Sequence, residues 1–189
     1  MQSVIRLLLA SLLLCCVLSP AHAQELPRVR VTTSMGAFVI ELDTARAPLT
    51  VRNFLEYVRA GHYNGTVFHR VINNFVAQGG GFDEKGAEKP TQPSIPNESG
   101  NGLSNRRGTV GLARTGLPHS GNAQFYVNLA DNAALDPQPS RWGYAVFGRI
   151  VEGMNVMDDI GAVATGAVGS FDKDTPLKPV VIVKVEELK

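Results

Sequence analysis

Cysteine is almost absent from this chain, and its two copies, Cys15 and Cys16, both lie near the N-terminus. The rest of the chain has no thiol, which excludes a thiol enzyme, a cysteine-ligated metal site and a disulfide framework there. A domain without disulfides must be stabilised mainly by its hydrophobic core. We therefore expect a fold that tolerates an oxidising compartment without any disulfide chemistry.

Neither sign of charge is in clear excess. The chain has 18 Lys and Arg residues against 17 Asp and Glu residues. Proteins that bind nucleic acids need a basic surface to neutralise the phosphates. Nucleic acid is therefore not an expected partner.

The only long apolar run, residues 7–18, is too short to span a bilayer comfortably. It follows the positive charge of Arg6 and precedes the small residues of Ala21-His22-Ala23. This order predicts a secretory signal peptide over residues 1–23, followed by one mature domain over residues 24–189. A retained N-terminal anchor and a lipoprotein signal are the alternatives. After cleavage we expect no stable membrane insertion.

The common catalytic and metal-binding motifs are missing as well. The chain has no Gly-x-Ser-x-Gly sequence. The glycine-rich segment 78–81 lacks the Lys-Ser/Thr pair and the following helix of a phosphate-binding loop. His62, His69 and His119 do not have the spacing of zinc ligands, and no acidic cluster accompanies them. We therefore expect neither a metal site nor hydrolase chemistry.

Much of the sequence consists of short segments in which polar and apolar residues alternate. Residues 28–33 and 37–42 alternate and predict a first hairpin. Residues 68–82 predict two strands joined by an Asn73-Asn74 turn. Further strands are predicted over residues 108–112, 124–129, 144–150 and 180–187. The long segment 83–107 is irregular, and a loop of that length in a compact domain is usually functional.

Only two segments favour helices. In residues 47–60, Val51, Phe54, Leu55 and Val58 form an apolar stripe at helical spacing. A second, shorter helix is predicted over residues 153–160. About eight strands and two helices indicate an all-β domain with a closed or nearly closed antiparallel sheet, with one helix over each open end. A doubly wound α/β sheet would need helices between most strands.

Arg70 is unusual because it lies among Phe, Val and Ile residues in a predicted strand. A guanidinium is always charged and is almost never buried without a partner. Alternation along the strand allows Arg70 to point outward as an ordinary surface residue. The alternative is that it lies at the rim of an apolar pocket, where it donates hydrogen bonds. The local pattern leaves both interpretations open.

Five sequence blocks nevertheless resemble one known family, the cyclophilin-type peptidyl-prolyl isomerases. Phe68-His69-Arg70-Val71-Ile72 with Phe75, followed by Gln78-Gly79-Gly80, resembles the family signature. The other blocks follow in family order at residues 108–114, 121–127, 135–136 and 145–153. Together they cover nearly the whole of residues 24–189. The segment 131–136 and the predicted signal peptide are most similar to bacterial periplasmic cyclophilins.

The resemblance implies a closed eight-stranded antiparallel barrel with two capping α-helices. It also implies a cofactor-independent isomerase in the periplasm, acting as a monomer on proline-containing peptides and on unfolded or flexible secreted proteins. Arg70 matches the catalytic residue of the family. The expected substrate-binding residues are Phe75, Val76, Gln78, Ala113, Arg114, Gln124, Tyr126, Leu135 and Tyr144. Among them, Gln78 matches the residue that braces the arginine, and Arg114 is expected to act through its main chain.

Four positions depart from the commonest family pattern. Val76 replaces Met, Tyr126 replaces Phe, Ala134 replaces Trp and Tyr144 replaces His. Many eukaryotic members of the family use that Trp to hydrogen-bond cyclosporin, so Ala134 predicts weak cyclosporin binding. Trp142 is close in sequence and could reach the site, although a packed or half-exposed indole is the simpler expectation.

Two other function classes compete with the isomerase. A peptide-binding chaperone or adaptor would use the same groove without needing turnover. An interaction domain with an inactive site is the third hypothesis, and the presence of Arg70, Phe75, Gln78 and Gln124 argues against it.

Overall fold

The computed structural model describes residues 25–189, and the predicted signal peptide over residues 1–23 lies outside them. The strands are β1 (Arg28–Thr33), β2 (Gly36–Leu42), β3 (Thr66–Val67), β4 (Arg70–Ile72), β5 (Val76–Gly79), β6 (Thr109–Leu112), β7 (Phe125–Asn128), β8 (Val146–Glu152), β9 (Thr165–Val168), β10 (Phe171–Pro176) and β11 (Val181–Leu188). The helices are α1 (Pro48–Arg59), α2 (Met154–Gly161) and the short 3-10 helix η1 (Ala133–Leu135). None of these helices is long and apolar enough to cross a membrane. The prediction of a mainly-β domain with two α-helices is confirmed.

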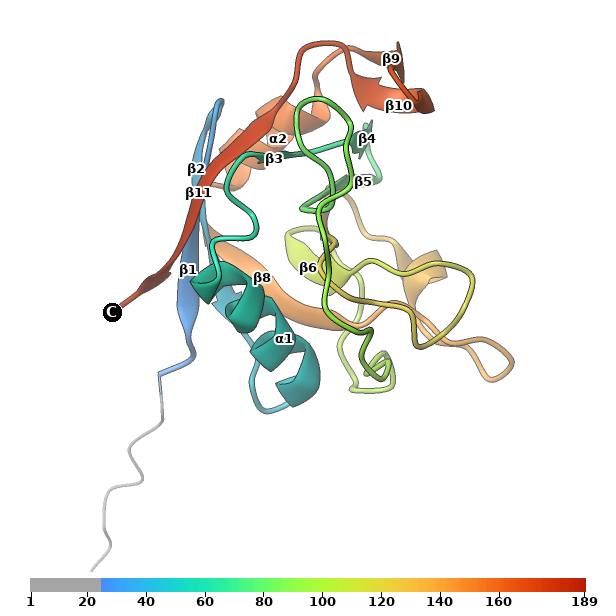
Figure 1. The fold of residues 1–189 in the computed structure, drawn as a ribbon. Helices are drawn as coiled ribbons and strands as arrows, with labels where there is room; N and C mark the ends of the chain where they lie inside the picture. The colour runs from blue at the N-terminus through green and yellow to red at the C-terminus, as the bar shows by residue number, and fades with distance from the viewer. Residues whose placement is uncertain (1–24) are drawn as a thin grey trace, which may run out of the picture.

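Nine strands form one antiparallel sheet in the order β3-β11-β1-β2-β8-β6-β7-β5-β4. The sheet curls into a half-barrel, with α1 and α2 near its two different ends (Figure 1). Helix α1 packs on β8 and β11, whereas α2 packs on β2, β4 and β5. The edge strands β3 and β4 are separated in sequence by Phe68 and His69 only. No ladder between them is recorded within residues 25–189, so the closed eight-stranded barrel stays a prediction.

The hairpin of β9 and β10 is a separate two-stranded sheet that the sequence pattern did not reveal. Its strands contain Gly, Asp, Lys, Thr and Pro rather than alternating apolar residues. The turn uses Gly169 at a φ of 58°, which suits glycine. The ladder is also irregular between Phe171 and Thr175. A hairpin of this composition depends on its packing against the rest of the protein, which a local pattern does not report.

Helix α1 forms where the apolar stripe predicts it and buries that stripe. Val51, Phe54, Leu55 and Val58 are all buried. Phe54 is fully buried, and its ring centroid lies 5.1 Å from those of Tyr63 and Phe147. Aromatic contacts of this kind add to the stabilisation from buried area alone. The helix thus covers one side of the main core.

The N-terminus of α1 is capped from far away in sequence. Ala47, at the N-cap position, makes no side-chain cap. Instead the carboxylate of Glu98 accepts hydrogen bonds from the backbone N–H groups of Leu49 and Thr50 (3.1 and 2.8 Å) and from the Thr50 hydroxyl (2.7 Å). A negative charge at a helix N-terminus is stabilising. Glu98 therefore ties the irregular segment 83–107 to α1.

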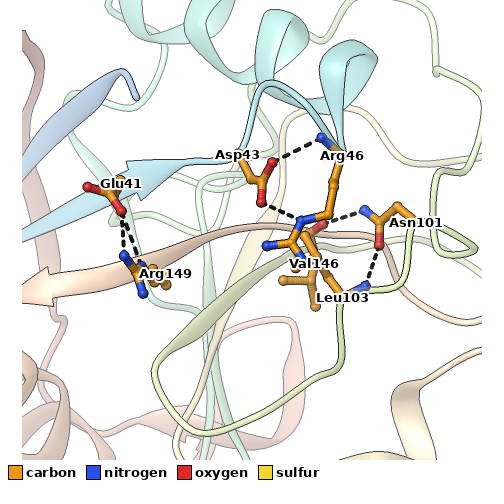
Figure 2. Close-up of polar contacts among 7 residues, drawn as sticks. All are labelled: Glu41, Asp43, Arg46, Asn101, Leu103, Val146 and Arg149. Carbon is orange, nitrogen blue, oxygen red and sulfur yellow. Dashed lines mark hydrogen bonds and ion pairs between the residues drawn. The ribbon is translucent and has the colours of Figure 1, made fainter. Parts of the chain in front are cut away.

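Further polar contacts hold the same segment against β8. The Asn101 side chain donates to the Val146 carbonyl (2.9 Å) and accepts from the Leu103 N–H (3.0 Å) (Figure 2). On the adjoining strands, Glu41 of β2 accepts hydrogen bonds from Arg149 of β8 (Figure 2). The Asn101 contact thus attaches to β8 a segment whose only β-structure is isolated bridges.

We expect Glu98→Ala to lower the free energy of unfolding by about 1–2 kcal/mol, because it removes the cap of α1 and leaves two helix N–H groups without their partner. Urea denaturation monitored by circular dichroism measures this change. Glu84→Ala, an exposed acid of the same segment, is the matched control. Equal stability of the two variants would contradict the capping role.

Candidate active site

Arg70 is placed by the register of three neighbouring strands. Arg70 of β4 lies opposite Gln78 of β5, and Gln78 lies opposite Tyr126 of β7. Directly opposed residues point to the same face of a sheet. The alternate residues of these strands, such as Val71 and Phe125, belong to the main hydrophobic core. The row of Arg70, Gln78 and Tyr126 therefore lies on the face of the sheet opposite the core.

The next residue in this row is Gly111 of β6, which lies opposite Tyr126. A Cβ atom at Gly111 would lie 2.3 Å from the Tyr126 ring and hydroxyl. Only glycine leaves room for the phenol to lie over β6. Because Gly111 has no side chain, the Tyr126 ring can lie directly over it.

A cleft of about 330 Å³ opens on this face. Its lining residues are Arg70, Phe75, Val76, Gln78, Ala113, Arg114, Tyr126, Leu135 and Tyr144. The structure thus brings together every residue that the sequence proposed for the site except Gln124. Gln124 lies beside the cleft, because its side-chain oxygen accepts a hydrogen bond from Gln78 (2.9 Å). What each residue does to a substrate stays a prediction.

The floor of the cleft is an apolar cluster of its own. Val76, Ala113 and Tyr126 are buried together, and the partly buried Phe75, Leu135 and Tyr144 pack against them. The cluster is separate from the main core on the other face of the sheet. A small apolar ring that binds in the cleft would pack against these side chains. The apolar surfaces of both would then be removed from water, which is favourable.

A polar network supports this floor from behind. The Tyr126 hydroxyl donates to Asn105 Oδ1 at 2.6 Å, and Asn128 Nδ2 donates to the same oxygen at 3.1 Å. Asn132 in turn donates to Asn128 Oδ1 (2.8 Å) and to the carbonyl of Phe75 (2.9 Å). Burial raises the pKa of Tyr126 well above its usual value, so its hydroxyl stays a donor. The network fixes both the phenol and the backbone beside it.

Asp136 anchors the other side of Asn105. It accepts hydrogen bonds from the Asn105 backbone N–H (2.7 Å), from Asn105 Nδ2 (2.8 Å) and from the Ser104 hydroxyl. Partial burial acts to raise the pKa of Asp136, but these hydrogen bonds outweigh it and lower the pKa below its usual value. The carboxylate therefore stays ionised and holds Asn105 under Tyr126.

Sequence reasoning missed Asn105 and Asn128. Both are buried polar residues, and buried amides are normally hydrogen-bonded. Asn105 lies in the irregular segment, where no periodicity marks it. Asn128 lies inside the strand predicted over residues 124–129 and could have been noticed as a polar residue among apolar neighbours.

The guanidinium of Arg70 is not held by other side chains of the cleft. Its side chain is 40% exposed, and its nearest ionic partner is Asp174, with 4.0 Å between Arg70 Nε and Asp174 Oδ2. The Gln78 amide N–H group donates to Gln124, and the bracing of Arg70 by Gln78 stays a prediction. Within the described part of the chain, the Arg70 side chain makes no hydrogen bond. Arg70 itself lines the cleft.

His69, the residue before Arg70, is buried against aromatic rings. Its ring centroid lies 4.7 Å from that of Phe82 and 5.7 Å from that of Phe171. Burial lowers the pKa of His69 to about 4. His69 is therefore neutral at physiological pH, and Arg70 carries the only positive charge of the pair.

Arg114 does more for the site than its main chain alone. Its guanidinium lies 4.4 Å from the centroid of the Tyr144 ring, a cation–π distance. It also donates to the carbonyls of Gly143 (3.1 Å) and Trp142 (2.7 Å). The indole of Trp142 is 46% exposed, packs edge-on against His119 and does not line the cleft. The simpler expectation for Trp142 is the correct one.

A larger hollow of about 570 Å³ lies at another place on the surface. It is lined by residues that include Asn74, Arg107 and Asp158. The Arg107 guanidinium is engaged there by both oxygens of Asp158 (2.8 and 2.9 Å). No cluster of three or more potential metal ligands occurs in residues 25–189. The cleft at Arg70 is the better candidate, because it combines apolar walls with an uncommitted guanidinium.

Comparisons with known proteins point to one family. Residues 28–187 match the family model described as cyclophilin type peptidyl-prolyl cis-trans isomerase/CLD. The chain is 52% identical over 157 residues to the peptidyl-prolyl cis-trans isomerase cyp18 of Streptomyces antibioticus, which covers 82% of this chain and 94% of that protein. It is 47% identical over 172 residues to peptidyl-prolyl cis-trans isomerase A of Dickeya dadantii, with 90% of each chain covered.

The fold is also similar to a solved structure. A cyclophilin type peptidyl-prolyl cis-trans isomerase of Cryptosporidium parvum, crystallised in the presence of the dipeptide Ala-Pro, gives a TM-score of 0.68 at 22% identity. The match covers 86% of this chain and 99% of that one. At this level of identity the likeness concerns the fold.

We expect Tyr126→Phe to lower the free energy of unfolding by about 1–2 kcal/mol, because Asn105 Oδ1 loses its shorter hydrogen bond in a buried network. Equilibrium urea denaturation measures the change. Tyr144→Phe, in the same cleft, is the control, because its hydroxyl makes no hydrogen bond to residues 25–189, and its stability should stay within about 0.5 kcal/mol. A loss as large for Tyr144→Phe as for Tyr126→Phe would contradict the role of the network.

Proposed function

Since this chain belongs to the cyclophilin-type peptidyl-prolyl cis-trans isomerases and is an enzyme of that class, we propose that Arg70 carries its catalysis and that its substrates are secreted proteins that fold in the periplasm. The observation that supports the first part is the uncommitted guanidinium at the rim of an apolar cleft. The second part rests on the N-terminal sequence pattern and on the similarity to bacterial isomerases.

The reaction sets the demand on the site. Rotation about an X-Pro bond has an uncatalysed barrier of about 18–20 kcal/mol and takes roughly 10–100 s. No covalent bond is broken, so the reaction needs no nucleophile. An acceleration of about 10⁵-fold requires about 7 kcal/mol of stabilisation that the twisted state receives and the planar states do not.

Burial of the proline ring on the apolar floor does not meet this demand. Contacts with Val76, Leu135 and the Tyr126 ring are worth about 1–2 kcal/mol, and the ring keeps them in the cis, trans and twisted states alike. Such uniform binding improves affinity without raising the rate of the bound substrate. The floor therefore selects proline and holds it in place.

Arg70 can distinguish the twisted state. As the bond twists, amide resonance is lost and the prolyl nitrogen gains a localised lone pair. A guanidinium N–H directed at this nitrogen stabilises the twisted state selectively, more so where the cleft excludes water. Gln78, Ala113, Arg114 and Gln124 would hold the extended backbone of the substrate on either side.

Proline-containing peptides are the substrate class that this site fits. The presence of an Ala-Pro dipeptide with the fold relative from C. parvum supports this choice. Secreted chains that are unfolded or flexible expose such segments, and we propose that the enzyme acts on them as a monomer. Weak binding of cyclosporin stays a prediction, because Ala134 has no N–H group to replace an indole.

We also infer that the sheet closes on itself. Its edge strands β3 and β4 are joined by Phe68 and His69 alone, so the covalent chain bridges the gap where no ladder is recorded. Counting β3 and β4 as one bent strand would give the predicted eight. Arg70 is then the first residue after the junction.

A chaperone or adaptor role is the second candidate, because the same cleft can bind a proline-containing segment without turning it over. The two functions differ in their dependence on Arg70. Peptide binding depends on the apolar floor and the groove, whereas isomerisation also requires the Arg70 guanidinium.

We expect Arg70→Ala to reduce kcat/KM for a proline-containing tetrapeptide by about 10²- to 10³-fold, the loss typical of removing one transition-state donor. A protease-coupled assay measures the rate, and circular dichroism checks the fold. Arg52→Ala, an exposed arginine on α1, is the control and should have full activity. Unchanged turnover of Arg70→Ala would overturn the mechanism, and unaltered protection of an aggregating client by this variant would support a separate chaperone role.

We expect the full chain, expressed in a Gram-negative host, to be recovered from the periplasmic fraction with Gln24 as its first residue. Mass spectrometry of the purified protein determines the N-terminus. In the control, Leu13→Arg interrupts the apolar run and should leave an uncleaved protein in the cytoplasm. Recovery of uncleaved wild-type protein from the cytoplasm would refute the proposed location.

A further inference from the structure

The hairpin of β9 and β10, which the proposed mechanism does not use, lies directly beside the catalytic candidate. Its second strand packs on β4, the strand that begins with Arg70, and Figure 1 shows the two next to each other. The hairpin is not hydrogen-bonded into the main sheet. Side-chain contacts therefore hold it in place.

Two of these contacts hold the residue that precedes Arg70. The buried hydroxyl of Thr175 donates to the backbone carbonyl of His69 at 2.9 Å. The ring of Phe171 stacks on the His69 imidazole, with the ring planes 30° apart. These contacts fix the backbone from which the Arg70 side chain extends.

Asp174, the residue before Thr175, has an unusual backbone. Its φ of 59° lies in the left-handed region, and Asn74 is the only other residue besides glycine with a positive φ in residues 25–189. Non-glycine residues in this region are held there by the surrounding structure, often at functional sites. Here the conformation coincides with a carboxylate 4.0 Å from Arg70 Nε.

We propose that Asp174 is a positioning residue for Arg70, orienting its guanidinium towards the cleft; this inference rests on the proposed catalytic role of Arg70. At 4.0 Å the contact between Nε and the carboxylate is too long for a direct hydrogen bond. The attraction therefore aligns the guanidinium without occupying its N–H donors. A bidentate ion pair would instead consume the donors that the substrate needs.

Arg70 and Asp174 are both partly exposed, so their attraction is expected to orient Arg70 rather than to stabilise the fold. The side chains of Arg70 and Asp174 are 40% and 28% exposed, and ion pairs of this kind add little to stability. His69 is neutral at physiological pH, and Asp172 and Lys173 of the same hairpin are exposed. Loss of the Asp174 charge should therefore change the alignment of Arg70 and leave the fold intact.

The test is Asp174→Asn, because asparagine keeps the shape of the side chain and tolerates the left-handed conformation. We expect kcat to fall by about 3- to 10-fold, with KM changed by less than about twofold, since misalignment of a catalytic group acts on the transition state. Asp172→Asn, with the same loss of charge in the same hairpin, should keep the wild-type kcat. The Nε–Hε resonance of Arg70 should shift in Asp174→Asn and not in Asp172→Asn.

A double variant distinguishes the possible failures. In the Arg70→Ala background, residual turnover measured by exchange NMR at high enzyme concentration should not fall further when Asp174→Asn is added. A further drop of the same 3- to 10-fold would show a structural role and overturn the proposal, as would an unchanged kcat of Asp174→Asn in the presence of Arg70. If Arg70→Ala itself retained full activity, the proposed mechanism would fail first, and the positioning role with it.

Discussion

The site depends on one cross-strand register. Arg70, Gln78, Tyr126 and Gly111 lie in a row across β4, β5, β7 and β6. Because side chains alternate between the faces of a strand, the neighbours of these residues point into the core and are fixed by its packing. A slip of one residue in any of these pairings would move a site residue to the core face. The packing of the hydrophobic core thus helps to specify where the Arg70 side chain leaves the sheet.

Polar contacts between distant parts of the chain also hold the residues of the site in place. Asn105 and Asp136 hold the Tyr126 phenol, Glu98 ties the irregular segment to α1, and the β9–β10 hairpin packs beside Arg70. All of these contacts join residues that are far apart in sequence. They are largely side-chain hydrogen bonds of buried or partly buried groups, which are costly to leave unpaired. The floor of the cleft is therefore held by hydrogen bonds from several segments of the chain.

The sequence predicted the elements whose signal is local. The stripe of α1 and the apolar alternation of β1, β2 and β7 give the mainly-β class, and the family blocks gave the residues around the cleft. The pattern around Arg70 alone could not decide between a surface residue and a pocket residue. It also could not predict the β9–β10 hairpin, Glu98, Asn105 or Asp174. The hairpin and these three polar residues lie in segments without periodicity. Their roles depend on contacts between distant parts of the chain.

The separation of the two apolar clusters has a consequence for how such an enzyme can evolve. Val76, Ala113 and Tyr126 form the pocket floor on one face of the sheet, while the residues of the main hydrophobic core pack on the other. Substitutions on the floor can change the shape of the pocket while the main core keeps its packing. Val76 and Tyr126, where the commonest family pattern has Met and Phe, are two such changes. Substrate preference can therefore diverge among relatives that share one stable scaffold.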